Sequence, residues 1–435
     1  MEPRPVKIYS KECSSRLDYI AAVILGDILG LTWETVTDKR KLGKNHIINY
    51  SDEKISGAFN IIPDTLLFEK NIEYHEISVT NWRDLPVFFQ TERGSDLPFD
   101  IFAASFWLVT RYEEYNDNDP DEHGRFKASS SLAFKNGFLD RPVVDLWCRE
   151  FAKTLLKKFN SLVFRSNNFR SLLTIDIDQA FAYRGRNIVR SLGGFIRDFT
   201  NSERHAAERY RIMTGSGKDP FDVFDFISGK ITEYNVRAGF FIPVGDYSEY
   251  DKNPSWKNED YRSLISGVSS KYETGLHPSY HASERHQTIT SELSRLNSIT
   301  GNKITKSRFH YLRFNIPQSY QYLIKAGIEE DYSLGYPDEP GFRAGIARPF
   351  RFFDLTGNEP TDLKIVPFQV MDATLFHYKR TDPLSALEVI LNLITQTRKA
   401  GGLFISIWHN TYLLENDECQ GWRETFETIL RTLAS

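Results

Sequence analysis

Short apolar runs separated by helical patterns dominate the chain from residue 171 onward. The runs have the length and the β-branched or aromatic content of buried strands, and they lie at residues 172–177, 239–244, 311–314, 365–370 and 403–408. The clearest helical pattern between them covers residues 383–399, where Asp382 suits the N-cap and Gly401 stops the helix. Such alternation of strands and helices predicts a mostly parallel α/β fold.

The first 165 residues follow a different pattern. Residues 17–29 and 100–115 carry apolar side chains at helical spacing, whereas residues 47–50 and 59–62 have the pattern of short strands. A further helix is predicted at 142–159, and a polar, turn-rich segment follows it. A chain of 435 residues is too long for one ordinary core. We therefore expect a smaller α+β domain at 1–168 and an α/β domain at 169–435.

Composition and charge narrow the classes of function. The net charge is −4 and no long Lys/Arg run is present, which argues against a nucleic-acid partner. Cys13, Cys148 and Cys419 lie far apart and form no metal or redox motif, as in proteins of a reducing compartment. Residues 1–9 are polar where a signal peptide would be apolar, and residues 20–29 are too few to span a bilayer. We expect a cytoplasmic protein without a transmembrane segment.

Residues of the kind that bind metals follow the predicted strands. Asp176 and Asp178 are two apart on a strand, so their side chains share a face. His277 and His281, four residues apart, would meet on one face of a helical turn. Two imidazoles and one carboxylate leave a zinc-like ion one open position for water, and a second carboxylate is the base that a metal-assisted hydrolase needs. The alternative is a set of solvated strand-end carboxylates and surface histidines.

Three further candidates lie in the last hundred residues. His409 follows the 403–408 run and suits proton transfer near neutral pH, with Asp372 as the acceptor of its ring N–H. Arg343 lies in a glycine-rich stretch, where it either caps a strand or pairs with Asp176 and keeps that carboxylate ionised. We expect His310 to have a structural role.

The order of these residues resembles the five motifs of polysaccharide deacetylases (carbohydrate esterase family 4). The resemblance covers residues 170–412 and rests on Thr174-Ile-Asp-Ile-Asp178, His277-Pro-Ser-Tyr-His281, Phe342-Arg-Ala-Gly345, Asp372 and Ile407-Trp-His409. It implies a distorted (β/α) barrel and the removal of N-acetyl, or less often O-acetyl, from a sugar. The N-terminal part resembles the accessory domain that precedes the deacetylase domain in some bacterial envelope-polysaccharide proteins.

The resemblance also implies a role for each matching residue. The implied metal ligands are Asp178, His277 and His281, and the implied catalytic residues are Asp176 as general base, His409 as general acid, Asp372 as the partner orienting His409, and Arg343 as the partner of Asp176. This ligand set suits Zn²⁺ first, with Co²⁺, Ni²⁺ or Fe²⁺ as alternatives. The expected substrate is an acetylated amino sugar or a glycan precursor.

The sequence departs from the family pattern at three points. Ile177 separates two aspartates that are usually adjacent, Pro278 stands in place of Ser or Thr, and Gly345 stands where proline is usual. Two other functions therefore remain open. One is a carbohydrate-binding or assembly protein that keeps the deacetylase fold without turnover, and the other is an amidohydrolase of the same superfamily that acts on a non-sugar amide.

Overall fold

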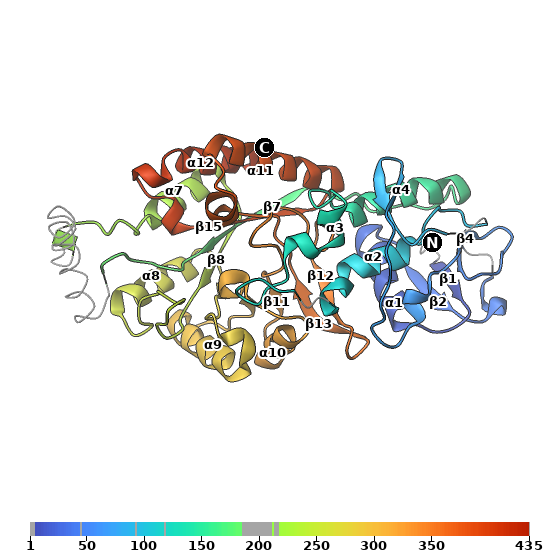
Figure 1. Cartoon of the computed structure of the whole chain (residues 1–435), viewed down its shortest axis with the longest axis horizontal. Helices are drawn as coiled ribbons and strands as arrows, with labels where there is room; N and C mark the ends of the chain where they lie inside the picture. Colours follow the sequence, from blue (N-terminus) through green and yellow to red (C-terminus); the bar gives the residue numbers. More distant parts are fainter. Residues whose placement is uncertain are drawn as a thin grey trace.

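The structure, a computed structural model, describes residues 5–43, 46–91, 94–116, 119–184, 211–212 and 217–434. The elements spread along one long axis, with β1 to β4 and α1 towards one end and the strands from β7 onward nearer the centre (Figure 1). None of the helices in these ranges combines the length and the apolar character that crossing a membrane requires.

A four-stranded parallel sheet in the order β2-β1-β3-β4 opens the chain. Its strands are β1 (Val6–Ser10), β2 (Trp33–Val36), β3 (Ile47–Tyr50) and β4 (Phe59–Ile61). Helix α1 (Ser15–Ala21) and the π-helix Ala22–Ile28 that continues it connect β1 to β2, which lets the two strands run in the same direction. This part is therefore built on a parallel sheet, beside a small hairpin of β5 (Thr80–Trp82) and β6 (Leu85–Val87).

Three further helices complete the first part of the chain: α2 (Ile101–Val109), the short α3 (Leu132–Lys135) and α4 (Val143–Lys158). Helix α2 is buried at every position, and the side chain of Asp100 caps it by accepting from the N–H groups of Phe102 and Ala103. The helices predicted at 17–29, 100–115 and 142–159 are thus confirmed. Helix α2 ends at Val109, before the end of the predicted range at residue 115.

A nine-stranded sheet in the order β12-β13-β11-β10-β9-β8-β7-β15-β14 forms the centre of the molecule. Every neighbouring pair is parallel except β12 with β13. The strands are β7 (Arg170–Asp176), β8 (Ala238–Ile242), β9 (Glu273–Leu276), β10 (Lys306–Ser307), β11 (Glu330–Asp331), β12 (Phe350–Asp354), β13 (Glu359–Ile365), β14 (Val370–Met371) and β15 (Leu403–His409).

The order of strands in this sheet largely follows their order in the chain, with β7 in the interior of the sheet. From β7 it runs through β8, β9, β10 and β11 to β13, while β14 and β15 return to the other side of β7. No ladder joins β14 to β12 or β13 within the described ranges, so these ladders form an open sheet. The α/β class expected for this part is confirmed.

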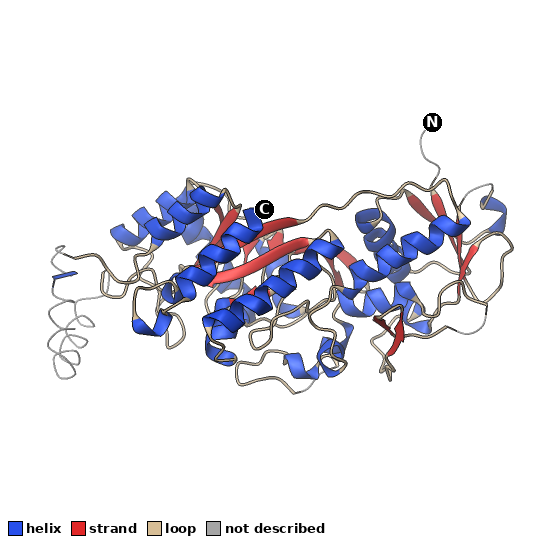
Figure 2. Cartoon of the chain, turned by 90° about the horizontal axis from the view of Figure 1, so that it is seen from above, coloured by secondary structure: helices blue, strands red, loops and turns tan. Residues whose placement is uncertain are grey.

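Helices alternate with the strands and lie along the outside of the sheet (Figures 1 and 2). They are α7 (Phe224–Tyr234), α8 (Glu259–Ser269), α9 (His286–Thr300), α10 (Gln318–Ala326), α11 (Pro383–Ala400) and α12 (Trp422–Ala434). Helix α11 begins and ends as predicted, because Asp382 accepts from the N–H groups of Leu384 and Ser385 and Gly401 takes a φ of 61°.

The strand predicted at 311–314 is wrong. Residues His310–Leu312 form a 3₁₀ turn in which Tyr311 and Leu312 have φ values of 58° and 52°. The strand of this segment is β10, which lies just before the turn and has only two residues. An apolar run therefore marked the turn and not the strand.

One continuous apolar core contains residues from both sides of the predicted boundary at residue 168. Buried ion pairs cross it as well: Nε of Arg343 lies 2.9 Å from Oε1 of Glu114, and Nε of Arg348 lies 2.5 Å from Oδ1 of Asp145. The division into 1–168 and 169–435 stays a prediction.

Gly345 belongs to this shared core. Its φ is 63°, and a Cβ added there would lie 2.7 Å from Cδ1 of Leu108 in α2. Its carbonyl accepts the N–H of Val144 at 2.9 Å. Proline, which is restricted to a φ near −65°, cannot take this conformation, so the glycine follows from the close contact with α2.

Candidate functional site

A cavity of about 300 Å³ opens where the parallel strands end, and Asp176, Asp178, His277 and His409 are among the residues that line it. Asp176 is the last residue of β7 and lies opposite His409, the last residue of β15, in the strand register. Asp178 follows β7 by two residues, and His277 directly follows β9. Carboxyl ends of parallel strands meet at one edge of a sheet, which is why residues so far apart in sequence lie together here.

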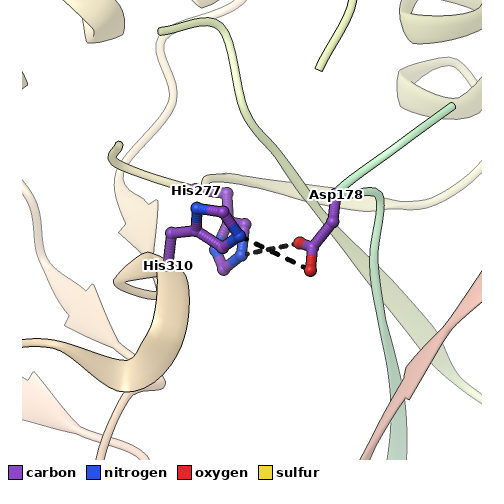
Figure 3. A group of neighbouring side chains, drawn as sticks. All are labelled: Asp178, His277 and His310. Atoms are coloured by element: carbon purple, nitrogen blue, oxygen red, sulfur yellow. Dashed lines mark ion pairs between the residues drawn. The ribbon is translucent and has the colours of Figure 1, made fainter. Parts of the chain in front are cut away.

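Asp178, His277 and His310 form a cluster whose ligand atoms all lie within 4.8 Å of one another (Figure 3). Nε2 of His277 lies 3.1 Å from Oδ1 of Asp178, and Nε2 of His310 lies 3.5 Å from Oδ2. The two imidazoles come from different loops and point at the same carboxylate, as Figure 3 shows.

The far side of each ring is held by an acceptor. Nδ1 of His277 lies 2.5 Å from the carbonyl oxygen of Arg308, and Nδ1 of His310 lies 2.8 Å from Oδ1 of Asp251. Because a carbonyl or carboxylate oxygen only accepts, each Nδ1 carries the proton and each Nε2 of the neutral ring has a free lone pair. Both rings are therefore oriented as metal ligands are.

Oδ1 of Asp178 is a further indication of a cation site, beside the clustering of the ligand atoms and the orientation of the two rings. This atom is buried, and although Nε2 of His277 lies 3.1 Å away, no residue that the structure describes donates a hydrogen bond to it. A buried carboxylate oxygen normally has a hydrogen-bond donor or a cation as its partner. Two imidazole nitrogens and this carboxylate fit a tetrahedral divalent ion with one position left open.

The protonation states of His310 and Asp178 are set by their charged neighbours. Burial lowers the pKa of His310, but Asp178 and Asp251 outweigh it and raise that pKa to about 9. Burial opposes ionisation of Asp178, yet His310 and His409 hold the pKa of that carboxyl well below its usual value. At neutral pH the metal-free cluster therefore contains a carboxylate and a protonated His310, and a metal ion has to displace that proton.

His281 does not lie in the cluster. Residues 277–281 are not helical, so the spacing of four residues does not bring the two rings together. The side chain of His281 is 59% exposed, and its Nδ1 lies 3.9 Å from Oε2 of Glu284. His310, for which the sequence suggested a structural role, occupies the place expected for His281.

Asp176 is paired with a different arginine from the one expected. Nη1 of Arg308 donates to its Oδ1 at 2.6 Å, and both side chains are buried. Arg343, expected as this partner, turns the other way and binds Glu114 through Nε and Nη2 at 2.9 and 2.6 Å. Arg308 lies just after β10, closer to the strand ends, and so it reaches the carboxylate.

His409 and Asp372 lie together. Nδ1 of His409 is 2.6 Å from Oδ1 of Asp372, whose Oδ2 accepts the main-chain N–H of His409, also at 2.6 Å. Burial lowers the pKa of His409, but Asp372 and Asp178 outweigh it and raise that pKa to about 10. Burial raises the pKa of Asp372. Nε2 of His409 faces the cluster, 3.6 Å from Oδ2 of Asp178.

Sequence reasoning missed His310, Arg308 and Asp251. His310 and Arg308 follow β10, which at two residues is too short to leave an apolar run. Asp251 lies in the loop after β8, and its importance depends only on its contact with His310. The signal available in the sequence was a histidine and an arginine, His310 and Arg308, in one short segment.

Comparison with known proteins gives a partial match. Residues 6–160, less than half of the chain, match the model of a family described as "Family of unknown function (DUF7033)". No curated protein sequence matches the chain. The first part of the chain thus has relatives as a sequence, but none of them lends it a function.

Among the solved structures that match part of the chain, three serve as examples. A Mycobacterium smegmatis protein named as a polysaccharide deacetylase has 15% identity and a TM-score of 0.41, with 61% of this chain and 85% of that one covered. PuuE allantoinase has 11% identity and a TM-score of 0.39, with coverages of 60% and 84%. A carbohydrate esterase family 4 pseudoenzyme from Bacillus anthracis has 11% identity and a TM-score of 0.33, and the chain spans 62% of its length. The class that the fold and the cluster define is a mixed α/β protein with a candidate divalent-metal centre.

Proposed function

We propose that the protein is a metal-dependent hydrolase that removes an acetyl group, N-acetyl before O-acetyl, from a carbohydrate of bacterial envelope polysaccharide metabolism. The observation that carries the proposal is the meeting of three ligand atoms, from Asp178, His277 and His310, with Asp176 and His409 in one cavity. The strand order around β7 supports a distorted (β/α) barrel with one open seam.

The three ligands would hold a divalent ion, Zn²⁺ first and Co²⁺, Ni²⁺ or Fe²⁺ as alternatives. When bound, such an ion polarises an acetyl carbonyl and lowers the pKa of water. This ligand set replaces His281 by His310, because His281 is exposed and turned towards Glu284.

Asp176 is the general base of the proposed reaction. Arg308 binds its Oδ1, which leaves Oδ2 facing the cluster, 3.9 Å from Nε2 of His277. From this position Oδ2 accepts a proton from the attacking water.

His409 is the general acid, and Asp372 orients it. The raised pKa keeps His409 protonated at neutral pH, with Nδ1 held by Asp372 and Nε2 turned to the cavity. Nε2 donates its proton to the departing amine, which would otherwise leave as an unstable anion. Arg343, bound to Glu114, is not part of the proposed mechanism.

The cavity walls suit a sugar. The rings of Tyr311 and Tyr378, 38% and 45% exposed, line it beside the cluster. Aromatic side chains with a few convergent polar groups are the usual lining of a small-molecule site, and a sugar ring has a C–H face that packs on an aromatic ring.

The test is the metal content of protein purified without chelator, in the wild type and in two variants. His277→Ala/His310→Ala removes two proposed ligands, and His281→Ala is the matched control. We expect one equivalent of metal in the wild type and in His281→Ala, and none in the double variant. Acetate release from a panel of acetylated amino sugars then tests the reaction, with allantoin and simple acetamides in the same panel.

Three other outcomes would each reject a different part of the proposal. Bound metal with hydrolysis of only the non-sugar amides identifies an amidohydrolase of another substrate class. Absence of metal, even after reconstitution with Zn²⁺ or Co²⁺, identifies a carbohydrate-binding or assembly protein. Metal loss in His281→Ala with retention in the double variant overturns the ligand set.

A further inference from the structure

The segment Asp121-Glu-His-Gly-Arg125 forms a tight turn within the region of unknown function. A main-chain hydrogen bond joins its ends: the N–H of Asp121 donates to the carbonyl of Arg125 at 2.9 Å. Oδ1 of Asp121 accepts from the N–H groups of His123 and Arg125, both at 2.9 Å, and Oδ2 accepts from Nε of Arg125 at 2.7 Å. An aspartate that binds its own turn in this way makes the turn rigid.

The turn lies against the loops that carry the candidate metal site. Arg125 is only 4% exposed and lines the cavity. Its Nη1 donates to the carbonyl of Tyr311 at 2.7 Å, and its Nη2 donates to the hydroxyl of Tyr378 at 3.0 Å. One guanidinium thus joins the turn to two separate walls of the cavity.

A second residue of the turn makes contacts on the same side. Nδ1 of His123 lies 2.9 Å from the hydroxyl of Tyr280, and the carbonyl of His123 accepts from Nε of Arg313 at 3.0 Å. Tyr280 is three residues after the ligand His277, and Arg313 is three residues after the ligand His310. The turn therefore contacts the loops of both proposed histidine ligands.

The loop that follows His310 needs such support. Tyr311 and Leu312 both have positive φ, at 58° and 52°, although neither is glycine. Conformations of this kind are strained in residues other than glycine and persist only where surrounding contacts hold them. The hydrogen bond from Arg125 to the carbonyl of Tyr311 falls on the first of these two residues.

We propose that the region 6–160 is a working part of the active site, and that Arg125 is its positioning residue. Arg125 fixes the strained Tyr311 turn so that Nε2 of His310 faces Asp178, and it sets the Tyr311 and Tyr378 rings at the cavity wall. The inference rests on the proposed function, since it assumes that His310 binds a metal. It gives a role to a region that matches a family described as of unknown function.

The experiment measures the Kd for Co²⁺ from its visible absorption in the full-length wild type, Arg125→Ala and Arg125→Lys. Arg348→Ala is the matched control, because Arg348 also joins the two parts of the chain through a carboxylate, Asp145, but contacts no loop of the cluster. We expect Arg125→Ala to raise the Kd about 10- to 100-fold, as loss of a residue that orients a ligand does. Arg125→Lys keeps the charge but not the fork, and an intermediate Kd is expected.

Thermal unfolding of the same variants separates positioning from a general loss of stability. We expect Arg125→Ala and Arg348→Ala to lower the Tm, but only Arg125→Ala to weaken Co²⁺ binding and to raise the KM for an acetylated amino sugar. An unchanged Kd in Arg125→Ala, or in Arg125→Lys if Arg125→Ala does not fold, overturns the inference and leaves the proposed function intact. A wild type that binds no Co²⁺ overturns both.

Discussion

Nη1 of Arg308 donates to Oδ1 of Asp176 at 2.6 Å, while the carbonyl of the same arginine accepts from Nδ1 of His277 at 2.5 Å. One residue thus orients the proposed base through its side chain and a proposed metal ligand through its main chain. Both partners of the ion pair are buried, so water cannot solvate either charge if its partner is removed.

Removal of the Arg308 guanidinium is expected to destabilise the protein strongly. Arg308→Met leaves the Asp176 carboxylate buried without its partner, which costs about 3–5 kcal/mol in the free energy of unfolding. Urea denaturation of the metal-free protein measures it. The control is Arg351→Met, which removes an exposed pair with Asp362 and should cost no more than about 1 kcal/mol. Equal costs for the two variants would contradict the role given to Arg308.

Asp176→Asn is expected to separate catalysis from metal binding. The amide cannot take the proton of the attacking water, and we expect kcat to fall about 10²- to 10⁴-fold. Metal content should stay at the wild-type level, because Asp176 lies outside the ligand cluster. Asp178→Asn, two residues away, should lose the metal itself. A variant at Asp176 with full activity would exclude it as the base.

The affinity for metal is expected to depend steeply on pH. Since Asp178 and Asp251 raise the pKa of His310 to about 9, each metal ion that binds at neutral pH releases the proton of this ring. The Kd for Zn²⁺ should therefore fall about tenfold per pH unit up to about pH 9 and then level off. Competition with a chromophoric chelator at several pH values measures this slope, and a flat profile would speak against His310 as a ligand.

His409 is expected to stabilise the metal-free protein in its protonated form. Its pKa is raised to about 10 in the folded chain, against an ordinary value of about 6.5 in the unfolded chain. A raised pKa means that this contribution is complete below pH 6.5 and is lost as the pH rises towards 10. The difference in unfolding free energy between wild type and His409→Gln should shrink over that range. A difference that grows with pH would mean that His409 is neutral in the fold.

Gly345 is expected to tolerate no side chain. An alanine there would combine a positive φ with a Cβ 2.7 Å from Cδ1 of Leu108, and we expect a loss of about 1–3 kcal/mol. Gly267 in α8 is the matched control, because its added Cβ would meet nothing within 4 Å and alanine favours a helix by about 0.5–1 kcal/mol. The two substitutions should therefore shift the Tm in opposite directions.

The sequence predicted those parts of the site that follow long strands. Asp176, Asp178 and His409 flank β7 and β15, which have seven residues each and leave clear apolar runs. His277 was singled out by its spacing from His281, and in the structure it directly follows β9. In these places local pattern and tertiary position agree, since the end of a buried strand is also the edge of the sheet.

The sequence failed where the arrangement depends on a turn or on reach across space. Spacing alone suggested His281, but residues 277–281 are not helical, and the exposed His281 faces Glu284. Which arginine pairs with Asp176 depends on how loops from distant parts of the chain pack. The periodicity of apolar residues in the sequence does not predict that packing. The barrel expected from the family resemblance is likewise a matter of whether β14 meets β12 or β13, which strand patterns do not determine.

The pairing of β7 with β15 has a consequence for biosynthesis. These are the first and the last strands of the large sheet in chain order, and their register sets Asp176 opposite His409. A ribosome therefore exposes the proposed base and all three metal ligands well before it has made the proposed acid. Closing so long a stretch of chain is entropically costly and slow, and the half-built protein has the candidate metal ligands but not yet the proposed proton donor. In the proposed mechanism, hydrolysis would begin only once the final strand has been released and has docked beside the first.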